Sequence, residues 1–298
     1  MKITLITACY NSAGTIRTAM ESVFSQKGVD VEYIVVDGGS KDGTVEVVEE
    51  FSRNHLRRGY GGQEERKDRK EGFELKWISE RDRGMYDAIN KGIKMATGDV
   101  VGILNADDVL ATDETLKKIV ECFSRNHLRR GYGGQEERKD RKEDSRVESV
   151  DCVYADIRFV KEGETVEAVR NAETVRYCSA KRWRPWMFRF AAMVPHPSFY
   201  VRRECFEKLG GYSLDYRICA DFELELRYLL LAKLRAAYLP ECVVVMRMGG
   251  MSTSGWRSNM VINREDLRAL RAHGIWSCLP LIYLKYLFKM WGFVFKRK

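Results

Sequence analysis

The sequence predicts an α/β protein in which helices flank a mixed, mostly parallel sheet. Three short apolar runs carry this prediction, at residues 2–8, 32–36 and 100–104. Their lack of polar alternation is typical of parallel strands that are covered on both faces. Each run is followed by a turn rich in Asp, Asn or Gly. Because ligands of open α/β sheets bind at the carboxyl ends of the strands, these turns are the candidate sites.

The composition indicates one large globular domain, since 45% of the 298 residues are hydrophobic and 11% are aromatic. The eight cysteines form no Cys-x-x-Cys pair and have no histidine partners at zinc spacing. In a chain of this length, that pattern favours reduced thiols in a reducing compartment. The N-terminal residues lack the pattern of a signal peptide. We therefore expect a cytoplasmic protein.

An identical repeat of 21 residues, FSRNHLRRGYGGQEERKDRKE, occupies residues 51–71 and 123–143. Each copy holds seven Lys or Arg and four Asp or Glu, so the two copies supply +6 of the net charge of +8. The repeat has too few large apolar residues to build a core. We expect two surface insertions that are helical only at their start. A basic patch that binds anionic lipid or nucleic acid is the alternative, but a solvated loop is favoured, so we expect no nucleic acid partner.

The N-terminal third should contain two successive strand–turn–helix units. The first strand is followed by the turn 9–14 and a helix that Thr15 opens. The second is followed by Asp37, a glycine-rich turn, and a helix over 45–50 with Thr44 as its N-cap. Backbone N–H groups at such helix N-termini can bind a base or a phosphate.

Residues 77–110 should contribute a strand, a charged turn, a helix over 85–95, a second strand and an acidic turn. The charged turn and helix offer groups that could hold a diphosphate: Arg81, Asp82, Arg83, Asp87, Asn90 and Lys91. The acidic turn holds Asp107 and Asp108, whose charges repel each other unless a cation lies between them. Mg²⁺ and Mn²⁺ take one or two carboxylates together with substrate phosphates, so this turn is a candidate metal site.

The second half should begin with a strand over 152–157 and a hairpin over 158–169. The segment 177–193 is rich in Trp, Arg and Phe, which suits a lid or an acceptor surface, with a buried hydrophobic arm as the alternative. Asp221 begins a helix that reaches Leu231. There it is either an anion stabilised by the helix dipole or a base that faces an acceptor hydroxyl. We expect Glu223 and Glu225 to face outward or to cap the helix.

The C-terminal stretch 275–295 is strongly apolar but is interrupted by Pro280, Lys285 and Lys289. We expect residues 251–298 to form a helical segment after a main domain of residues 1–250. Its apolar part should be an amphipathic helix on an anionic membrane surface, with the basic residues 296–298 at the lipid. Two internal lysines argue against a membrane span. Packing on the domain or on a second copy, in a homodimer, is the alternative.

Four stretches together resemble the family 2 glycosyltransferases of the GT-A fold, and most of all those that build bacterial surface polysaccharides: TACYNSAGTI, VVDGGSKDGT, SERDRGMYDAINKGIKMATGDVVGILNADD and HPSFYVRRECFEKLGGYSLDYRICADFELELR. The resemblance implies that one set of residues binds the nucleotide-sugar: Thr7, Ala8, Tyr10, Asn11, Asp37, Asp82, Arg83, Asp87, Asn90, Asn105 and Ala106. The family's metal motif falls on residues 105–107, with Asp107 as the ligand and Asp108 assisting. Its catalytic base falls on Asp221, and His196 and Trp186 lie on the acceptor side.

These assignments imply an inverting transfer, aided by Mg²⁺ or Mn²⁺, from a UDP-sugar to a lipid-linked or polysaccharide acceptor. The enzyme would work at the inner face of the cytoplasmic membrane. A sugar-1-phosphate nucleotidyltransferase would share the acidic turn, but its N-terminal phosphate loop should be basic, and TACYNSAG carries no basic residue. A non-catalytic protein that binds nucleotides or nucleic acid through the basic insertions is the other alternative.

Overall fold

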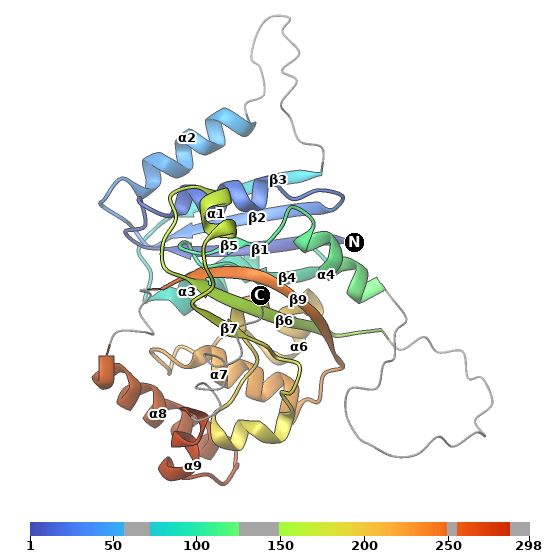
Figure 1. Ribbon diagram of the computed structural model, residues 1–298, viewed down its shortest axis with the longest axis vertical. Helices are drawn as coiled ribbons and strands as arrows, with labels where there is room; N and C mark the ends of the chain where they lie inside the picture. The colour runs from blue at the N-terminus through green and yellow to red at the C-terminus, as the bar shows by residue number, and fades with distance from the viewer. Residues whose placement is uncertain (57–71, 125–148, 249–254, 287–298) are drawn as a thin grey trace, which may run out of the picture.

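The computed structural model describes residues 1–56, 72–124, 149–248 and 255–286, which form one sheet with helices on both faces (Figure 1). The strands follow the order β3-β2-β1-β4-β8-β6-β9-β5, and β7 pairs with β6. Their bounds are β1 (Lys2–Cys9), β2 (Asp30–Asp37), β3 (Phe73–Ser79), β4 (Val100–Ile103), β5 (Val109–Leu110), β6 (Cys152–Val160), β7 (Arg176–Cys178), β8 (Tyr200–Arg202) and β9 (Ala236–Arg247).

The sheet is mixed and mostly parallel, as the sequence predicts. Strands β1 to β4 are parallel neighbours, and β6 is parallel to β9, whereas β8, β5 and β7 run antiparallel to their neighbours. The carboxyl ends of β1, β2, β3 and β4 therefore lie at one edge. The turns that the sequence singles out emerge from that edge.

Two layers of helices cover the sheet. One face is packed by α1 (Ile16–Phe24), α2 (Thr44–Leu56) and α4 (Thr115–Ser124). The other is packed by α3 (Met85–Met95), α6 (Arg203–Leu209), α7 (Ala220–Glu225), α8 (Gly255–Ala272) and α9 (Leu279–Tyr283). Leu5 and Ile6, adjacent in β1, belong to opposite layers, which explains why the strand is apolar at every position.

Close packing of α3 on β1 places the start of that helix over the ligand edge. A Cβ atom at Gly92 would lie 2.5 Å from Cγ2 of Ile6, so only glycine permits this approach. The first turn of α3 then carries Tyr86 toward the loop that precedes α7, where the tyrosine hydroxyl contacts the carbonyl oxygen of Ile218.

The predicted hairpin over 158–169 is wrong. A turn follows β6, and residues 166–171 form the helix α5 (Val166–Asn171). Thr165 caps this helix by accepting a hydrogen bond from the N–H group of Ala168 at 3.1 Å. Val166 and Val169, three residues apart, face the core, so the helical period outweighs the glycine-centred turn signal.

The C-terminal stretch is not one surface helix over 275–295. Residues 275–278 form a loop, α9 is short, and residues 287–298 lie outside the described part of the chain. Lys285 is 3% exposed, and its ammonium group lies 2.6 Å from the carboxylate of Asp266 in α8. Described residues of the predicted membrane helix thus pack on the domain. Within the described ranges, no helix has the length and apolarity that crossing a bilayer requires.

Both insertions begin as helix, as predicted: α2 extends to Leu56 and α4 to Ser124. Residues 57–71 and 125–148, which hold the rest of each repeat, lie outside the described residues.

Candidate active site

The turns after β1 and β2 are joined by hydrogen bonds. The backbone N–H of Asn11 donates to the hydroxyl of Ser40 at 2.7 Å, and the N–H of Lys41 donates to Oδ1 of Asn11 at 3.1 Å. Asn11 adopts a left-handed conformation with φ of 50°, which asparagine tolerates better than most residues. Tyr10 is left 63% exposed beside this paired turn. The two turns thus form one rigid rim with an exposed aromatic ring.

Asp37 holds the second turn in place. Its Oδ2 atom accepts hydrogen bonds from the N–H groups of Gly39 and Ser40, each at 3.0 Å, and from the hydroxyl of Ser79 at 2.7 Å. Burial alone would raise the pKa of Asp37, but the hydroxyls of Ser40 and Ser79 and the backbone N–H groups hold it below its usual value. Asp37 is therefore an anion that organises the rim.

Asp82, from the turn after β3, lies against the same rim. A Cβ atom on Gly38 would come within 2.5 Å of Oδ2 of Asp82, so the glycine makes room for that carboxylate. Arg83 and Asp87 form an ion pair of 3.6 Å at the start of α3. The structure thus brings Asp82, Arg83 and Asp87 to the edge where Asp37 lies.

Two predicted donor-site residues are engaged within the protein. The buried hydroxyl of Thr7 lies 2.8 Å from the carbonyl oxygen of Leu104 and 2.9 Å from the hydroxyl of Tyr33. The amide of Asn90 donates to the carbonyl oxygen of Tyr212 at 2.8 Å and accepts from the N–H of Tyr212 at 2.9 Å. Their side chains stabilise the sheet and the loop before α7, and Ala8 is half-buried beside Thr7.

The acidic turn after β4 contains a buried carboxylate, one oxygen of which could still bind a ligand. The amide of Asn105 donates to Oδ2 of Asp108 at 2.7 Å, whereas Oδ1 of Asp108 has no hydrogen-bond partner in the described structure. Burial and then the neighbouring Asp107 charge raise the pKa of Asp108 well above its usual value, and burial raises that of Asp107. A cation at this turn would offset both the burial of the two carboxylates and the repulsion between them.

Arg247, at the end of β9, is a neighbour of this turn that the sequence does not reveal. Its guanidinium group donates to the carbonyl oxygen of Asp107 at 2.5 Å, to that of Gly163 at 2.9 Å and to the hydroxyl of Thr18 at 2.8 Å. Asp107 and Asp108 act electrostatically on it. Arg247 thus fixes the backbone of the turn and leaves the Asp107 carboxylate half-buried.

Asp221 lies at the N-terminus of α7 and faces α3. Its Oδ1 atom is 3.2 Å from the hydroxyl of Tyr86 and accepts from the N–H of Phe222 at 2.8 Å. Burial raises the pKa of Asp221 to about 6, although both hydrogen bonds oppose the shift. A carboxylate with a pKa near the working pH can accept a proton in the reaction and release it afterwards.

A second polar network lies behind this contact. The Tyr212 ring stacks on the Tyr86 ring, with centroids 5.5 Å apart and an interplanar angle of 17°. The Tyr212 hydroxyl lies 3.0 Å from Nε2 of His196, and Nδ1 of His196 lies 3.4 Å from Oε1 of Glu225. Both ring nitrogens of His196 thus face groups of the protein. Its place on the acceptor side stays a prediction.

The prediction that Glu223 and Glu225 face outward or cap the helix is wrong, because both are buried. Glu223 pairs with Arg227 at 3.0 Å and lies 2.9 Å from Nε2 of His273. Burial raises the pKa of Glu225 to about 7, although His196 opposes the shift. The sequence of α7 does not reveal these partners. Only Arg227 is close to Glu223 in the sequence, whereas His273 and His196 come from distant segments.

The backbone before Asp221 is held by the C-terminal helix α8. The carboxylate of Glu265 accepts hydrogen bonds from the N–H groups of Arg217, Ile218 and Cys219 at 3.1, 2.9 and 3.0 Å.

Trp186, in the 3₁₀ turn Pro185–Phe190, is 57% exposed and available for contact with a ligand.

These features agree with the sequence family. A family model described as glycosyl transferase family 2 matches residues 4–209, more than half of the chain. The chain belongs to glycosyl transferase family 2. It is therefore a glycosyltransferase, and this assignment favours sugar transfer over nucleotidyl transfer and over nucleic-acid binding.

Relatives of this glycosyltransferase include a PGL/p-HBAD biosynthesis glycosyltransferase of Mycobacterium bovis, 25% identical over 266 residues that cover 89% of this chain and 82% of the relative. A poly-beta-1,6-N-acetyl-D-glucosamine synthase of Staphylococcus epidermidis is 31% identical over 125 residues, which cover 42% of this chain and 26% of that one.

Solved structures show the same GT-A fold. A mannosyltransferase from Pyrobaculum calidifontis, in complex with GDP-Man and Mn²⁺, has a TM-score of 0.57 and 20% identity, covering 98% of this chain and 72% of that one. S. aureus TarS 1–349 has a TM-score of 0.55 and 17% identity, covering 91% of this chain and 65% of that one. The glycosyltransferase thus spans less than two thirds of that TarS chain.

The acidic turn fits a divalent cation. Asp108 offers a buried oxygen without a partner, and Asp107 adds a second carboxylate. No group of three or more His, Cys, Asp or Glu side chains suited to a metal occurs among the described residues. One or two carboxylates are the protein ligands that Mg²⁺ usually takes when substrate phosphates complete its coordination.

Proposed function

We propose that this glycosyltransferase inverts the anomeric configuration as it moves a sugar from a UDP-sugar to a hydroxyl of a lipid-linked or polysaccharide acceptor. The observation that carries the proposal is the placement of the Asp221 carboxylate at the start of α7, where the Tyr86 hydroxyl and the Phe222 N–H orient it, and burial raises its pKa to about 6. A general base is most effective when its pKa lies near the working pH.

In the proposed step, Asp221 accepts the proton of the acceptor hydroxyl while the hydroxyl oxygen attacks the anomeric carbon. A new C–O bond forms on one side as the bond to the diphosphate breaks on the other, and UDP leaves with the bonding electrons. Attack opposite the leaving group inverts the anomeric centre. Asp221 then loses its proton to solvent, which its pKa permits at neutral pH.

The donor would bind along the rim formed after β1, β2 and β3. Tyr10 is exposed for stacking against the base, and the backbone of Asn11 and the anionic Asp37 lie beside it. Asp82, Arg83 and Asp87 would line the sugar and the diphosphate. Two of the TarS structures, with UDP and with UDP-GlcNAc, support a uridine nucleotide, although the likeness itself shows only the fold.

Asp107, assisted by Asp108, would hold Mg²⁺ or Mn²⁺ against the diphosphate, while Asn105 and Ala106 shape the turn. The cation, when bound, neutralises charge that develops on the leaving group. Trp186 would face the acceptor, since its exposed ring can stack on a sugar.

The stereochemical outcome tests this proposal. The purified enzyme is supplied with a panel of UDP-sugars and candidate acceptors, and the anomeric configuration of the product is determined by NMR. We expect a product with the inverted anomeric configuration. We expect Asp221→Asn to lose this activity. A product that retains the donor configuration would contradict the role of Asp221 as base in a single displacement.

A further inference from the structure

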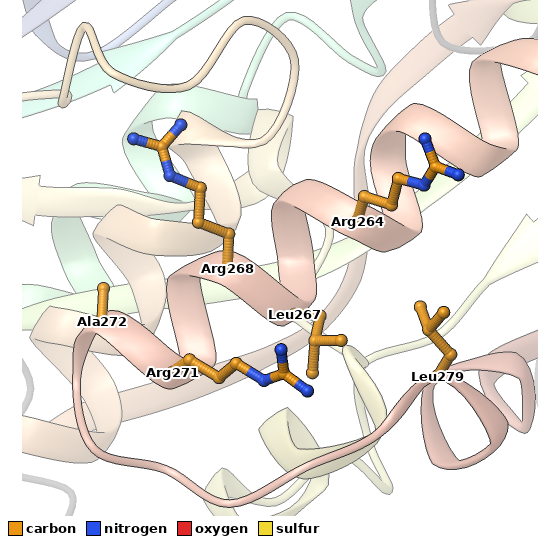
Figure 2. Close-up of a pocket in the computed structure, with 6 residues that line it drawn as sticks. All are labelled: Arg264, Leu267, Arg268, Arg271, Ala272 and Leu279. Atoms are coloured by element: carbon orange, nitrogen blue, oxygen red, sulfur yellow. The ribbon is translucent and has the colours of Figure 1, made fainter.

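A hollow of about 530 Å³ lies between α8 and α9, lined by Arg264, Leu267, Arg268, Arg271, Ala272 and Leu279. Figure 2 shows Arg264 and Arg271 projecting from α8 with Leu267 between them and Leu279 across from it on α9. The arginines recur after four and three residues, so they share one face of the helix. None of these residues belongs to the donor rim or to the acidic turn.

The three guanidinium groups face solvent without a described counter-charge. Each arginine is exposed, and in the described part of the chain none pairs with a carboxylate. Arg268 is fixed in place, because it donates to the carbonyl oxygen of Asp215 at 3.2 Å and lies over the Tyr216 ring at 5.3 Å. The carboxylate of Glu265, in the same helix, is engaged by three backbone N–H groups of the loop before α7. This face of α8 therefore favours an anionic ligand.

Exposed apolar and aromatic side chains lie in and around α9. Leu279, which lines the hollow, is 38% exposed, and the exposed fractions are 72% for Trp276, 49% for Tyr283 and 38% for Leu284. Exposed Trp, Tyr and Leu beside arginines are typical of surfaces that lie in the headgroup region of a membrane. A free anion would gain little from the aliphatic side chains of Leu279 and Leu284.

The basic stretches of the chain do not match this surface in charge. The repeats at 51–71 and 123–143 each carry a net charge of +3, and the last three residues are Lys296, Arg297 and Lys298. Like charges would oppose their docking against three arginines. The arginines and the exposed apolar side chains together favour an anion attached to an apolar body.

We propose that the α8–α9 surface docks on a bilayer, with Arg264 and Arg271 binding the phosphate of an anionic phospholipid and Trp276 and Leu279 entering the headgroup region. The inference rests on the proposed function, for which it names the membrane partner. It differs from the expectation of one amphipathic helix over 275–295, because α8 supplies the cations.

A contact between α8 and the loop before α7 gives this docking a consequence for the reaction. Glu265, in α8, holds the backbone of residues 217–219, two residues before Asp221. Arg268, on the arginine face, contacts Asp215 and Tyr216 in the same loop. Docking would thus bring the loop before the base close to the headgroups, where an acceptor sugar carried on a membrane lipid would lie.

Vesicle binding of the full chain tests the proposal. The wild type and Arg264→Gln/Arg271→Gln are mixed with phosphatidylcholine vesicles, with or without phosphatidylglycerol, and the bound fraction is measured by flotation. We expect binding that requires phosphatidylglycerol and falls about 30-fold in the variant, about fivefold for each arginine. The matched control is Arg53→Gln/Lys94→Gln, which removes the same charge from α2 and α3 and should bind like the wild type.

Equal binding of the arginine variant and the control would overturn the proposal and would assign any membrane binding to another basic segment. Binding of inorganic phosphate at these arginines, measured by calorimetry without vesicle binding, would also overturn it in favour of a free-anion site. UDP binding by both variants separates this proposal from the donor-site proposal. Failure of the wild type to bind UDP would contradict the latter whatever the vesicles show.

Discussion

The hydroxyl of Tyr86 lies 3.2 Å from the carboxylate of Asp221, although 135 residues separate them in the chain. This contact joins α3, which begins at the donor edge of the sheet, to α7, which carries the proposed base. The same hydroxyl contacts the carbonyl oxygen of Ile218 in the loop before α7. Position and protonation of Asp221 are therefore coupled to the donor side of the site.

Tyr86→Phe should move the acidic limb of the pH–rate profile to higher pH. The hydroxyl stabilises the charged form of Asp221, whose pKa is raised to about 6 mainly by burial. Losing a hydrogen bond of about 1 kcal/mol should raise this pKa by up to about 0.7 unit. Rates of sugar transfer from pH 5 to 8 measure the shift; a profile that superimposes on that of the wild type would show that the contact does not tune the base.

Asp221→Asn should reduce the transfer rate by about 10²–10⁴-fold, the range of general base catalysis. The amide can still accept the hydrogen bond from the Phe222 N–H, and UDP binding at the rim should be unchanged. Steady-state kinetics and UDP calorimetry on the same preparation separate the two effects. Loss of UDP affinity in parallel with activity would point to a donor-site role instead.

Glu225→Gln should stabilise the protein increasingly as the pH rises from about 4.5 to 7. Burial raises the pKa of Glu225 from 4.5 to about 7, so the folded state binds the proton more tightly than the unfolded state. The contribution of Glu225 to the free energy of unfolding of the wild type is therefore fully present below pH 4.5. It is lost as the pH rises through 7.

Glutamine mimics the protonated form, since it can accept from the Val194 N–H and donate toward His196. Denaturant melts of both proteins at pH 4.5, 6 and 7.5 give the comparison, with Glu164→Gln as an exposed control. A stability difference that stays constant with pH would mean that Glu225 does not titrate in this range.

Gly38→Ala should weaken UDP binding, because the new methyl group would lie 2.5 Å from Oδ2 of Asp82 and must displace it. The double variant Gly38→Ala/Asp82→Ala removes the clash, so its thermal stability should recover while its affinity for UDP should not. Calorimetry and thermal melts on the single and double variants measure both properties. Full recovery of affinity in the double variant would exclude Asp82 from the donor site.

The period and placement of apolar residues are enough to predict the ligand edge of the fold. Strands buried on both faces have a distinctive composition, and their ends bring Asp37 and the turn 105–108 to one edge. The partners of the candidate base could not be predicted this way. Tyr86 reads as a core residue of α3, and its contact with Asp221 depends on how two distant helices pack.

The protein partners of chemically plausible residues could not be predicted from the sequence either. Asn90 and His196 suggest ligand contacts by type, and the structure adds that both contact Tyr212. Glu225 reads as a surface carboxylate until its neighbours Val194 and His196 are placed around it. These hydrogen bonds join residues that lie 16 to 122 positions apart in the sequence. Local sequence patterns do not reach that far.

Calorimetry of UDP with and without Mn²⁺, on the wild type and Asp107→Ala, tests the central claim most directly. The alanine keeps the backbone carbonyl that Arg247 binds, so the turn should remain folded while one proposed metal ligand is lost. We predict tight, Mn²⁺-dependent binding of UDP by the wild type and loss of the Mn²⁺-dependent part in Asp107→Ala. Binding of UDP by Asp107→Ala with wild-type affinity and wild-type Mn²⁺ dependence would contradict the proposed donor site.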